Sequence, residues 1–116
     1  MDAGDEILVD AYGCAEPVLR DPAQVRALLE EVIASLDLRV VGTPLLHAFP
    51  GAGGVTALFL LQESHLSCHT FPERGYASFN LYCCRPRPDY PWAERLLASL
   101  GATRVHVRRI RRGEDA

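Results

Sequence analysis

The sequence predicts an α+β fold, a two-layer sandwich in which a largely antiparallel sheet carries two helices on one face. Short apolar runs of strand length and two amphipathic segments of helical spacing follow one another in the order βαβββαβ. Clusters of glycine, proline and polar residues separate these runs. Because 116 residues suffice for one hydrophobic core, we expect residues 1–116 to form a single domain.

The first half of the chain is predicted to contain one strand and one long helix. Residues 7–12 are largely apolar and are expected to form the strand. The helix is expected to begin at Asp21 and Pro22, because aspartate is a favoured N-cap and proline is favoured in the first turn. Apolar residues then recur at helical spacing to about Asp37. Residues 38–49 are expected to be extended.

The second half of the chain is predicted to contain the remaining strands. They are expected at residues 55–61, 64–70, 76–84 and 103–110. The first of them is a continuous apolar run, which is typical of a strand buried on both faces. A helix is expected over residues 92–100, because Gly101 is suited to end it. Turns are expected at residues 50–54 and 72–75, and a frayed polar tail over residues 111–116.

One face of the predicted sheet has no helix to cover it. On a protein of this size, a bare sheet face is usually buried against another subunit. We therefore expect a homodimer that forms through this face.

Composition and charge exclude several functions. The net charge of −3 argues against a general nucleic-acid binder, and no apolar stretch approaches the roughly 20 residues that span a bilayer. The acidic N-terminus is unlike a signal peptide. We therefore expect a cytoplasmic protein that binds neither nucleic acid nor membrane. All twelve basic residues are arginine, and the absence of lysine excludes a pyridoxal-phosphate anchor and a Walker A loop.

The cysteines are not arranged as a structural motif. There is no C-x-x-C pair, so neither a zinc ribbon nor a thioredoxin motif is present. Disulfides are improbable in a cytoplasmic chain. Cys83 and Cys84 are neighbours on a predicted strand and therefore point to opposite faces. One of them is expected to be buried and the other to be exposed to a site.

Reactive side chains are concentrated in the predicted hairpin around residues 72–75. If these residues form the turn, the numbers of paired residues sum to about 147. Ser64 then lies opposite Cys83 or Cys84, and His69 lies nearer the turn. A register shift of one residue exchanges the two faces of a strand, so spacing alone leaves both cysteines open.

The residues of this hairpin alone allow three interpretations. The first is a plain hairpin with polar edge residues. The second is a His/Cys metal site, but no ligand pair has a standard spacing, so no metal is expected. The third is a nucleophilic site in which a serine or cysteine acts with a histidine.

The same segment contains E-S-H-L at 63–66, H-T-F-P-E at 69–73 and G-Y-A at 75–77. These residues resemble the processing motif of the prokaryotic S-adenosylmethionine decarboxylase proenzyme family. The resemblance extends to residues 8–14 and 104–107, so it covers nearly the whole chain. It implies the fold of that family.

The resemblance implies that the chain makes its own cofactor, a covalent pyruvoyl group, from Ser64. In the family the serine hydroxyl attacks the carbonyl that precedes it, here that of Glu63. The resulting ester undergoes elimination and hydrolysis, which leaves the pyruvoyl. The chain is thereby cut into a beta chain, residues 1–63, and an alpha chain, residues 64–116.

Further site residues are implied by the same match. His69 matches the histidine that transfers a proton in processing, and Thr56 matches a serine that supports this step. Cys84 matches the cysteine that donates a proton to the decarboxylated substrate. Phe49 matches an aromatic residue that stacks on adenine, and Glu73 matches a carboxylate that holds the ribose hydroxyls.

The implied reaction is the decarboxylation of S-adenosylmethionine, whose amine forms a Schiff base with the pyruvoyl group. The products are CO₂ and decarboxylated S-adenosylmethionine, which donates the aminopropyl group in spermidine biosynthesis. His65 lies beside Ser64, and a structural role fits this residue as well as a functional one.

The chain departs from the pattern of the family at several positions. Gly4-Asp5-Glu6 stands where many members have a basic Gly-Arg/Lys-His, and Asn80 stands where aspartate is common. Phe71 replaces the usual tryptophan. Two alternatives therefore stay open. One is a pyruvoyl-dependent arginine or ornithine decarboxylase. Asp5 and Glu6 would attract its cationic substrate, unless these two residues belong to a solvated terminus.

The other alternative is an unprocessed, non-catalytic paralogue that binds a partner. In that case the arginine cluster between residues 104 and 112 would form a docking or RNA-contact surface. The acidic net charge and the alternation of this segment favour a solvated edge strand instead.

Overall fold

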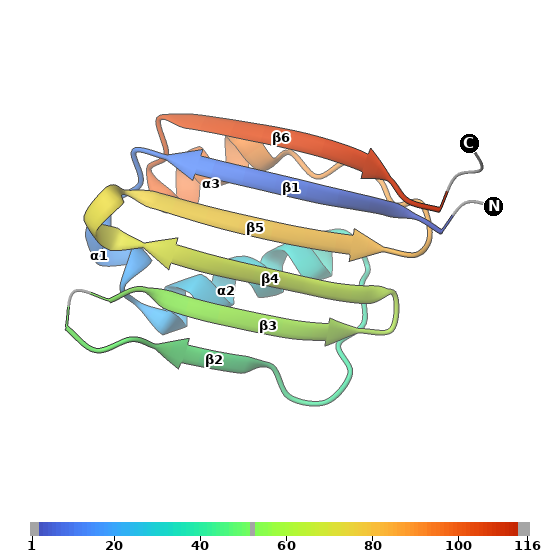
Figure 1. Cartoon of the computed structure of the whole chain (residues 1–116), viewed down its shortest axis with the longest axis horizontal. Helices are drawn as coiled ribbons and strands as arrows, with labels where there is room; N and C mark the ends of the chain where they lie inside the picture. Colours follow the sequence, from blue (N-terminus) through green and yellow to red (C-terminus); the bar gives the residue numbers. More distant parts are fainter. Residues whose placement is uncertain (1–2, 52, 114–116) are drawn as a thin grey trace.

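A computed structural model describes residues 3–51 and 53–113 (Figure 1). In this part of the chain six strands form one sheet: β1 Asp5–Tyr12, β2 Leu45–Ala48, β3 Val55–Leu61, β4 Ser64–Phe71, β5 Tyr76–Cys83 and β6 Arg104–Arg111. Their spatial order is β2-β3-β4-β5-β1-β6, and neighbouring strands are antiparallel. The first strand therefore lies between β5 and β6, close to one edge of the sheet.

The helices lie on one face of this sheet. They are α1 Glu16–Leu19, α2 Pro22–Ser35 and α3 Trp92–Leu100, and a 3₁₀ turn, η1 Pro72–Arg74, joins β4 to β5. Figure 1 shows α2 and α3 behind the strands, while the near face of the sheet carries no helix of the described residues. The predicted α+β two-layer sandwich is confirmed.

The hydrophobic core lies between the two layers. The buried apolar side chains of the helices are Leu19 on α1, Val25, Leu28, Leu29, Val32 and Ile33 on α2, and Trp92, Leu96 and Leu100 on α3. They join one cluster with alternate residues of the strands, among them Val9, Phe59 and Leu66. Burial of each such side chain contributes about 1.5–3 kcal/mol, so this contact between layers is the main stabilising term of the fold.

Two elements go beyond the predicted order βαβββαβ. Strand β2 lies in the segment expected only to be extended, and its residues are mostly exposed, so no burial pattern marks it. Helix α1 has four residues, too few to show a helical period. In addition, α2 ends at Ser35, because Asp37 already has a φ of +54°.

Strand β3 is not buried on both faces, contrary to the expectation from its apolar run. Its side chains alternate, and Leu58 and Leu60 are 46% and 61% exposed on the open face. Leu45 on the neighbouring β2 is 69% exposed. These three residues, Leu45, Leu58 and Leu60, are called the leucine patch below. The strand therefore has apolar residues on both faces, although only one face is buried in the core.

The β4–β5 hairpin has the predicted register. Ser64 pairs with Cys83, and His69 pairs with Ser78, so the paired numbers sum to 147. The turn requires Gly75, whose φ is +59° and whose added Cβ would lie 3.2 Å from the carbonyl oxygen of Cys14. This turn fixes which side chains of the two strands lie opposite one another.

Some predicted features lie outside the described residues. These are residues 1 and 2 of the acidic N-terminus, Ala52 of the turn and residues 114–116 of the tail. In the part of the chain that the structure describes, none of the helices has the length and apolar character needed to cross a membrane.

Candidate active site

The Glu63–Ser64 junction, where self-cleavage is expected, lies between β3 and β4. Glu63 is buried, with 9% of its surface exposed. One oxygen of its carboxylate accepts a hydrogen bond from the backbone N–H of Arg39 at 3.1 Å. The other accepts from the guanidinium of Arg87, also at 3.1 Å. Because a buried carboxylate is costly without such partners, these contacts fix the residue before the expected cleavage point.

The backbone is strained at the junction. Ser64 has a φ of +149°, a conformation that residues with a side chain rarely adopt and that costs on the order of 1–3 kcal/mol. The carbonyl oxygen of Glu63 accepts a hydrogen bond from the backbone N–H of Cys84 at 2.9 Å. A donor at this position stabilises the negative charge that develops on the oxygen when a nucleophile attacks the carbonyl carbon.

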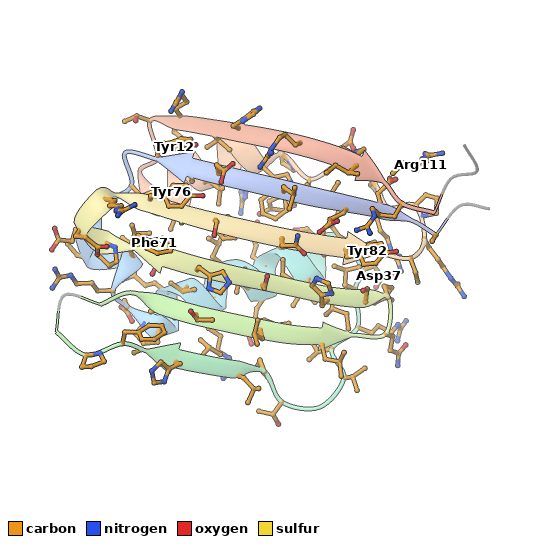
Figure 2. The ribbon with its side chains drawn as sticks, viewed as in Figure 1. Tyr12, Asp37, Phe71, Tyr76, Tyr82 and Arg111 are labelled. Carbon is orange, nitrogen blue, oxygen red and sulfur yellow. The ribbon has the colours of Figure 1, made fainter. Side chains whose placement is uncertain are left out.

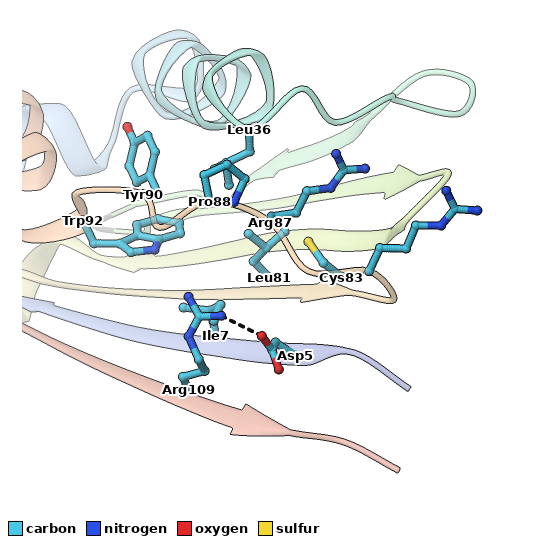
Figure 3. Close-up of a pocket in the computed structure, with 11 residues that line it drawn as sticks. Asp5, Ile7, Leu36, Leu81, Cys83, Arg87, Pro88, Tyr90, Trp92 and Arg109 are labelled. Carbon is cyan, nitrogen blue, oxygen red and sulfur yellow. Dashed lines mark hydrogen bonds and ion pairs between the residues drawn. The ribbon is translucent and has the colours of Figure 1, made fainter. Parts of the chain in front are cut away.

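The two vicinal cysteines differ in exposure, as predicted. Cys83 is buried, and Figure 3 shows its side chain on the helix side of the sheet, in a pocket that Arg87 also lines. Burial raises the pKa of the Cys83 thiol, which keeps the thiol protonated and unreactive. Cys84 is exposed, so it is the cysteine available to a substrate.

A chain of hydrogen bonds runs from Ser64 across the open face. Ser64 Oγ lies 3.3 Å from His65 Nδ1. His65 Nε2 lies 2.8 Å from Asn80 Oδ1, and Asn80 Nδ2 donates to Glu6 Oε2 at 2.7 Å. Arg112 donates to the other oxygen of Glu6 at 2.7 Å. The imidazole that contacts Ser64 is therefore that of His65.

The other predicted site residues lie at the opposite end of β4. One surface hollow there is lined by Phe49, Thr56, His69 and Glu73, called the His69 cluster below. His69 Nδ1 lies 3.0 Å from Thr56 Oγ1. Phe49 is an exposed residue and not part of the core. The two residues matched to substrate binding thus lie beside Thr56 and His69, which are matched to processing.

Two separate groups therefore make up the predicted site. His69 follows Ser64 by five residues on an extended strand, which places the two roughly 16 Å apart. Figure 2 shows the open face with Tyr82 near one end of β5 and Phe71 and Tyr76 at the other. Tyr82 marks the end that carries Ser64, and Phe71 marks the end that carries the His69 cluster.

Asp5 and Glu6 are paired within the sheet and are not part of a solvated terminus. Ion pairs between β1 and the last strand or the residue after it include Asp5–Arg109, Asp5–Arg111, Glu6–Arg112 and Asp10–Arg108. The hydrogen bond from Asn80, assisted by Arg112, lowers the pKa of Glu6. Because these carboxylates pair with the arginines, the edge-strand interpretation of the arginine cluster is favoured over a nucleic-acid contact.

Sequence reasoning missed the role of Arg87 and did not show that Glu6 and Asn80 are in contact. Nothing in the proline-rich segment at 85–91 marks one arginine as the partner of Glu63. The departures at Glu6 and Asn80 are separate in the sequence, yet they contact each other because β1 lies beside β5. Their joint departure from the family pattern was the available signal.

The Ser64 end of the sheet has the parts that peptide-bond chemistry requires. It presents a hydroxyl nucleophile, an imidazole beside it, a backbone donor on the carbonyl and a strained peptide. Among residues 3–51 and 53–113, no three His, Cys, Asp or Glu side chains are placed to hold a metal ion. The hydroxyl of Ser64 and the donor on the Glu63 carbonyl are suited to nucleophilic attack on that carbonyl.

Comparison with known proteins identifies the family of the chain. A family model described as S-adenosylmethionine decarboxylase matches residues 5–113. The chain belongs to the S-adenosylmethionine decarboxylase family. The matched range contains both ends of the site, so the resemblance drawn from the processing motif is confirmed.

Individual members of the S-adenosylmethionine decarboxylase family match most of the chain. The S-adenosylmethionine decarboxylase proenzyme of Symbiobacterium thermophilum is 36% identical over 114 residues, covering 97% of this chain and 85% of that protein. The proenzyme of Pyrococcus furiosus is 32% identical over 111 residues, covering 95% and 78%. The crystal structure of the adenosylmethionine decarboxylase from Aquifex aeolicus matches with a TM-score of 0.80 and 27% identity, covering 99% and 94%.

Proposed function

We propose that the chain is the proenzyme of a pyruvoyl-dependent S-adenosylmethionine decarboxylase. It cleaves itself between Glu63 and Ser64 and then releases CO₂ from S-adenosylmethionine, leaving the aminopropyl donor for spermidine synthesis. The observation that carries the proposal is the junction itself, where a strained serine follows a carbonyl held by the N–H of Cys84. The names of the relatives support the choice of substrate.

Self-cleavage begins with attack of Ser64 Oγ on the carbonyl carbon of Glu63. The peptide C–N bond breaks and an ester joins the two residues, while the N–H of Cys84 stabilises the oxyanion. Removal of the Cα proton of Ser64 then breaks its Cβ–O bond and releases Glu63 as a carboxylate. Water converts the dehydroalanine to the pyruvoyl group with loss of ammonia. The products are a beta chain, residues 1–63, and an alpha chain, residues 64–116.

His69 does not reach Ser64 of its own chain, because roughly 16 Å separate them along β4. We therefore assign the removal of the Cα proton to His69 of the partner subunit in a homodimer. The leucine patch leaves apolar surface on the open face for such a contact. A two-fold axis through this face brings the His69 cluster of each subunit toward Ser64 of the other. Thr56 holds the imidazole of His69 in place.

The residues around Ser64 fit a pyruvoyl group. When formed, the group supplies a carbonyl that accepts the electrons released as CO₂ leaves the substrate amine. The exposed Cys84 thiol lies at the same strand end and returns a proton to the substrate carbon. Phe49 and Glu73 of the partner's His69 cluster bind the adenine and the ribose.

S-adenosylmethionine is favoured over arginine or ornithine as the substrate. Asp5 and Glu6, the acidic residues suited to attract a guanidinium or ammonium, already pair with Arg109 and Arg112. The relatives matched over most of the chain are named for S-adenosylmethionine. The cytoplasmic location expected from the sequence stays a prediction.

A CO₂-release assay tests this proposal. Purified protein is incubated with carboxyl-labelled S-adenosylmethionine, arginine or ornithine, beside the Ser64→Ala variant. We expect CO₂ from S-adenosylmethionine alone and none from the variant. Release from arginine or ornithine would instead support the alternative decarboxylase, and no release from any substrate would support the non-catalytic paralogue.

A further inference from the structure

We propose that His65 is the catalytic base that accepts the hydroxyl proton of Ser64 in the first step of self-cleavage. Asn80 and Glu6 are positioning residues that hold His65 in the tautomer required for this role. The proposal rests on the proposed self-cleavage, and it assigns a proton transfer that neither Thr56 nor His69 of the same chain can reach.

The hydrogen-bond chain determines the tautomer of His65. A carboxylate only accepts hydrogen bonds, so Asn80 must turn its amide nitrogen toward Glu6, at 2.7 Å. The amide oxygen of Asn80 then faces His65 Nε2 at 2.8 Å, and an oxygen acceptor requires a proton on that nitrogen. His65 Nδ1 therefore carries the lone pair, and it lies 3.3 Å from Ser64 Oγ.

The surroundings hold the chain in this orientation. Arg112 donates to the second oxygen of Glu6 at 2.7 Å. The low pKa of Glu6, caused first by its hydrogen bond from Asn80, keeps the carboxylate an acceptor at neutral pH. The ring of Tyr82 meets the His65 ring edge-on at a centroid distance of 6.1 Å and limits its rotation.

The positions that orient His65 are two of the positions where this chain departs from its family pattern. Asn80 on β5 stands where aspartate is common, and in this chain the carboxylate is supplied by Glu6 on β1. The hydrogen bond between Asn80 and Glu6 connects these two positions across the neighbouring strands. Their arrangement follows that of a serine–histidine–acid triad, in which the third residue fixes the histidine tautomer.

The step is balanced without an added reagent. The Oγ proton moves to His65 Nδ1 as the bond from Oγ to the Glu63 carbonyl carbon forms. The imidazolium then returns the proton to the nitrogen of Ser64 as the peptide C–N bond breaks. His65 is neutral before and after the step, and the product is the ester. The later removal of the Cα proton is the step assigned above to His69 of the partner subunit, so the two histidines have separate roles.

Hydroxylamine distinguishes the two histidines, because it cleaves an ester and leaves the peptide bond intact. Wild type, Ser64→Ala, His65→Gln and His69→Gln chains are made as full-length proteins by cell-free translation, and cleavage is followed with and without hydroxylamine. We expect His65→Gln to cleave at least about 100-fold more slowly and to contain no hydroxylamine-sensitive ester. His69→Gln is expected to accumulate that ester.

The results separate this inference from the proposed function. If wild type stays intact, the proposed self-cleavage is wrong. If wild type is cleaved but His65→Gln accumulates the ester or reacts at the wild-type rate, the assignment of His65 is wrong. Circular dichroism checks the fold of each variant, and imidazole added to His65→Gly is expected to restore cleavage, which it would not do for a misfolded chain.

A pH profile provides the second readout. His65 is connected to Glu6 on β1 by way of Asn80, and Glu6 is paired with Arg112. The ring of Tyr82 on β5 contacts His65, and the residue paired with His65 on β3 is the apolar Leu60. Asn80→Asp adds a carboxylate at Nε2 and favours the protonated ring. The pH of half-maximal cleavage is expected to rise by about one unit. If Asn80→Asp still cleaves with an unchanged pH profile, the role proposed for Asn80 and Glu6 in positioning His65 is wrong.

Discussion

At the residue scale, the cleavage junction depends on one ion pair. The buried carboxylate of Glu63 is held by the guanidinium of Arg87, which comes from the loop after β5. Hydrogen bonds to a charged group contribute about 1.5–3 kcal/mol, similar in size to the strain at Ser64. Without the pair, Glu63 is free to relax toward solvent, and the strained peptide is no longer held against the N–H of Cys84.

Arg87→Met is therefore expected to slow self-cleavage by at least about tenfold, because about 1.4 kcal/mol of positioning is lost. Arg85→Met is the matched control, since Arg85 is an exposed arginine on the same loop. Cleavage is followed by gel, and Arg87→Lys is expected to recover part of the rate. Equal rates for Arg87→Met and Arg85→Met would show that the pair does not position the junction.

At the element scale, α3 is attached to the sheet by a narrow apolar face. Leu96 is fully buried, whereas its neighbour Leu97 is 60% exposed. In the Ser64→Ala background, which removes the cleavage, Leu96→Ala is expected to lower the free energy of unfolding by about 2–5 kcal/mol. Leu97→Ala should change it by less than about 0.5 kcal/mol. Urea unfolding measures both, and equal losses would contradict the packing described.

Two tyrosines connect elements by hydrogen bonds to carboxylates. Burial, with the hydrogen bond to Asp10, raises the pKa of Tyr76 to about 12, and burial with the bond to Glu31 does the same for Tyr90. The folded state therefore favours the neutral phenols. Their contribution is complete below the unfolded pKa of about 10 and is lost as the pH rises toward 12.

The urea midpoint of Ser64→Ala is accordingly expected to fall between pH 10 and pH 12. A chain that also carries Tyr76→Phe and Tyr90→Phe should show a smaller fall, because these phenols no longer ionise in the unfolded state. Parallel pH dependences of the two chains would contradict the assignment.

The elements that the sequence predicted well are those whose signal is local. The β4–β5 register followed from one turn, and the helices followed from apolar spacing and caps. Strand β2 was missed because four exposed edge residues carry no alternation. The outward face of β3 was misjudged because an apolar run does not show whether another subunit or a helix covers it. The chain from Glu6 to Asn80 and His65 required the neighbourhood of β1 and β5, which no local pattern contains.

At the scale of the whole molecule, the residues assigned to one reaction lie at opposite ends of the sheet. Ser64 and the His69 cluster lie at opposite ends of β4, so the proposed reaction requires two subunits. A mixed dimer tests this requirement. Differently tagged His69→Ala and Ser64→Ala chains are co-expressed, and each chain alone is expected to stay uncleaved. In the mixed dimer, the His69→Ala chain should be cleaved with the help of the intact His69 of its partner.

The control partner for this experiment carries Ser64→Ala and His69→Ala together and should give no cleavage. Cleavage of the His69→Ala chain by itself at the wild-type rate would place the proton transfer within one subunit. The distance between Ser64 and the His69 cluster would then have no role in the reaction.

The central claim, that the chain makes a pyruvoyl group at Ser64, is tested most directly by the intact mass of the purified protein beside its Ser64→Ala variant. We expect two fragments, residues 1–63 and residues 64–116, with the second one ammonia lighter than a fragment that begins with serine. The variant should give one full-length mass. A single uncut mass for the wild-type chain would contradict the account.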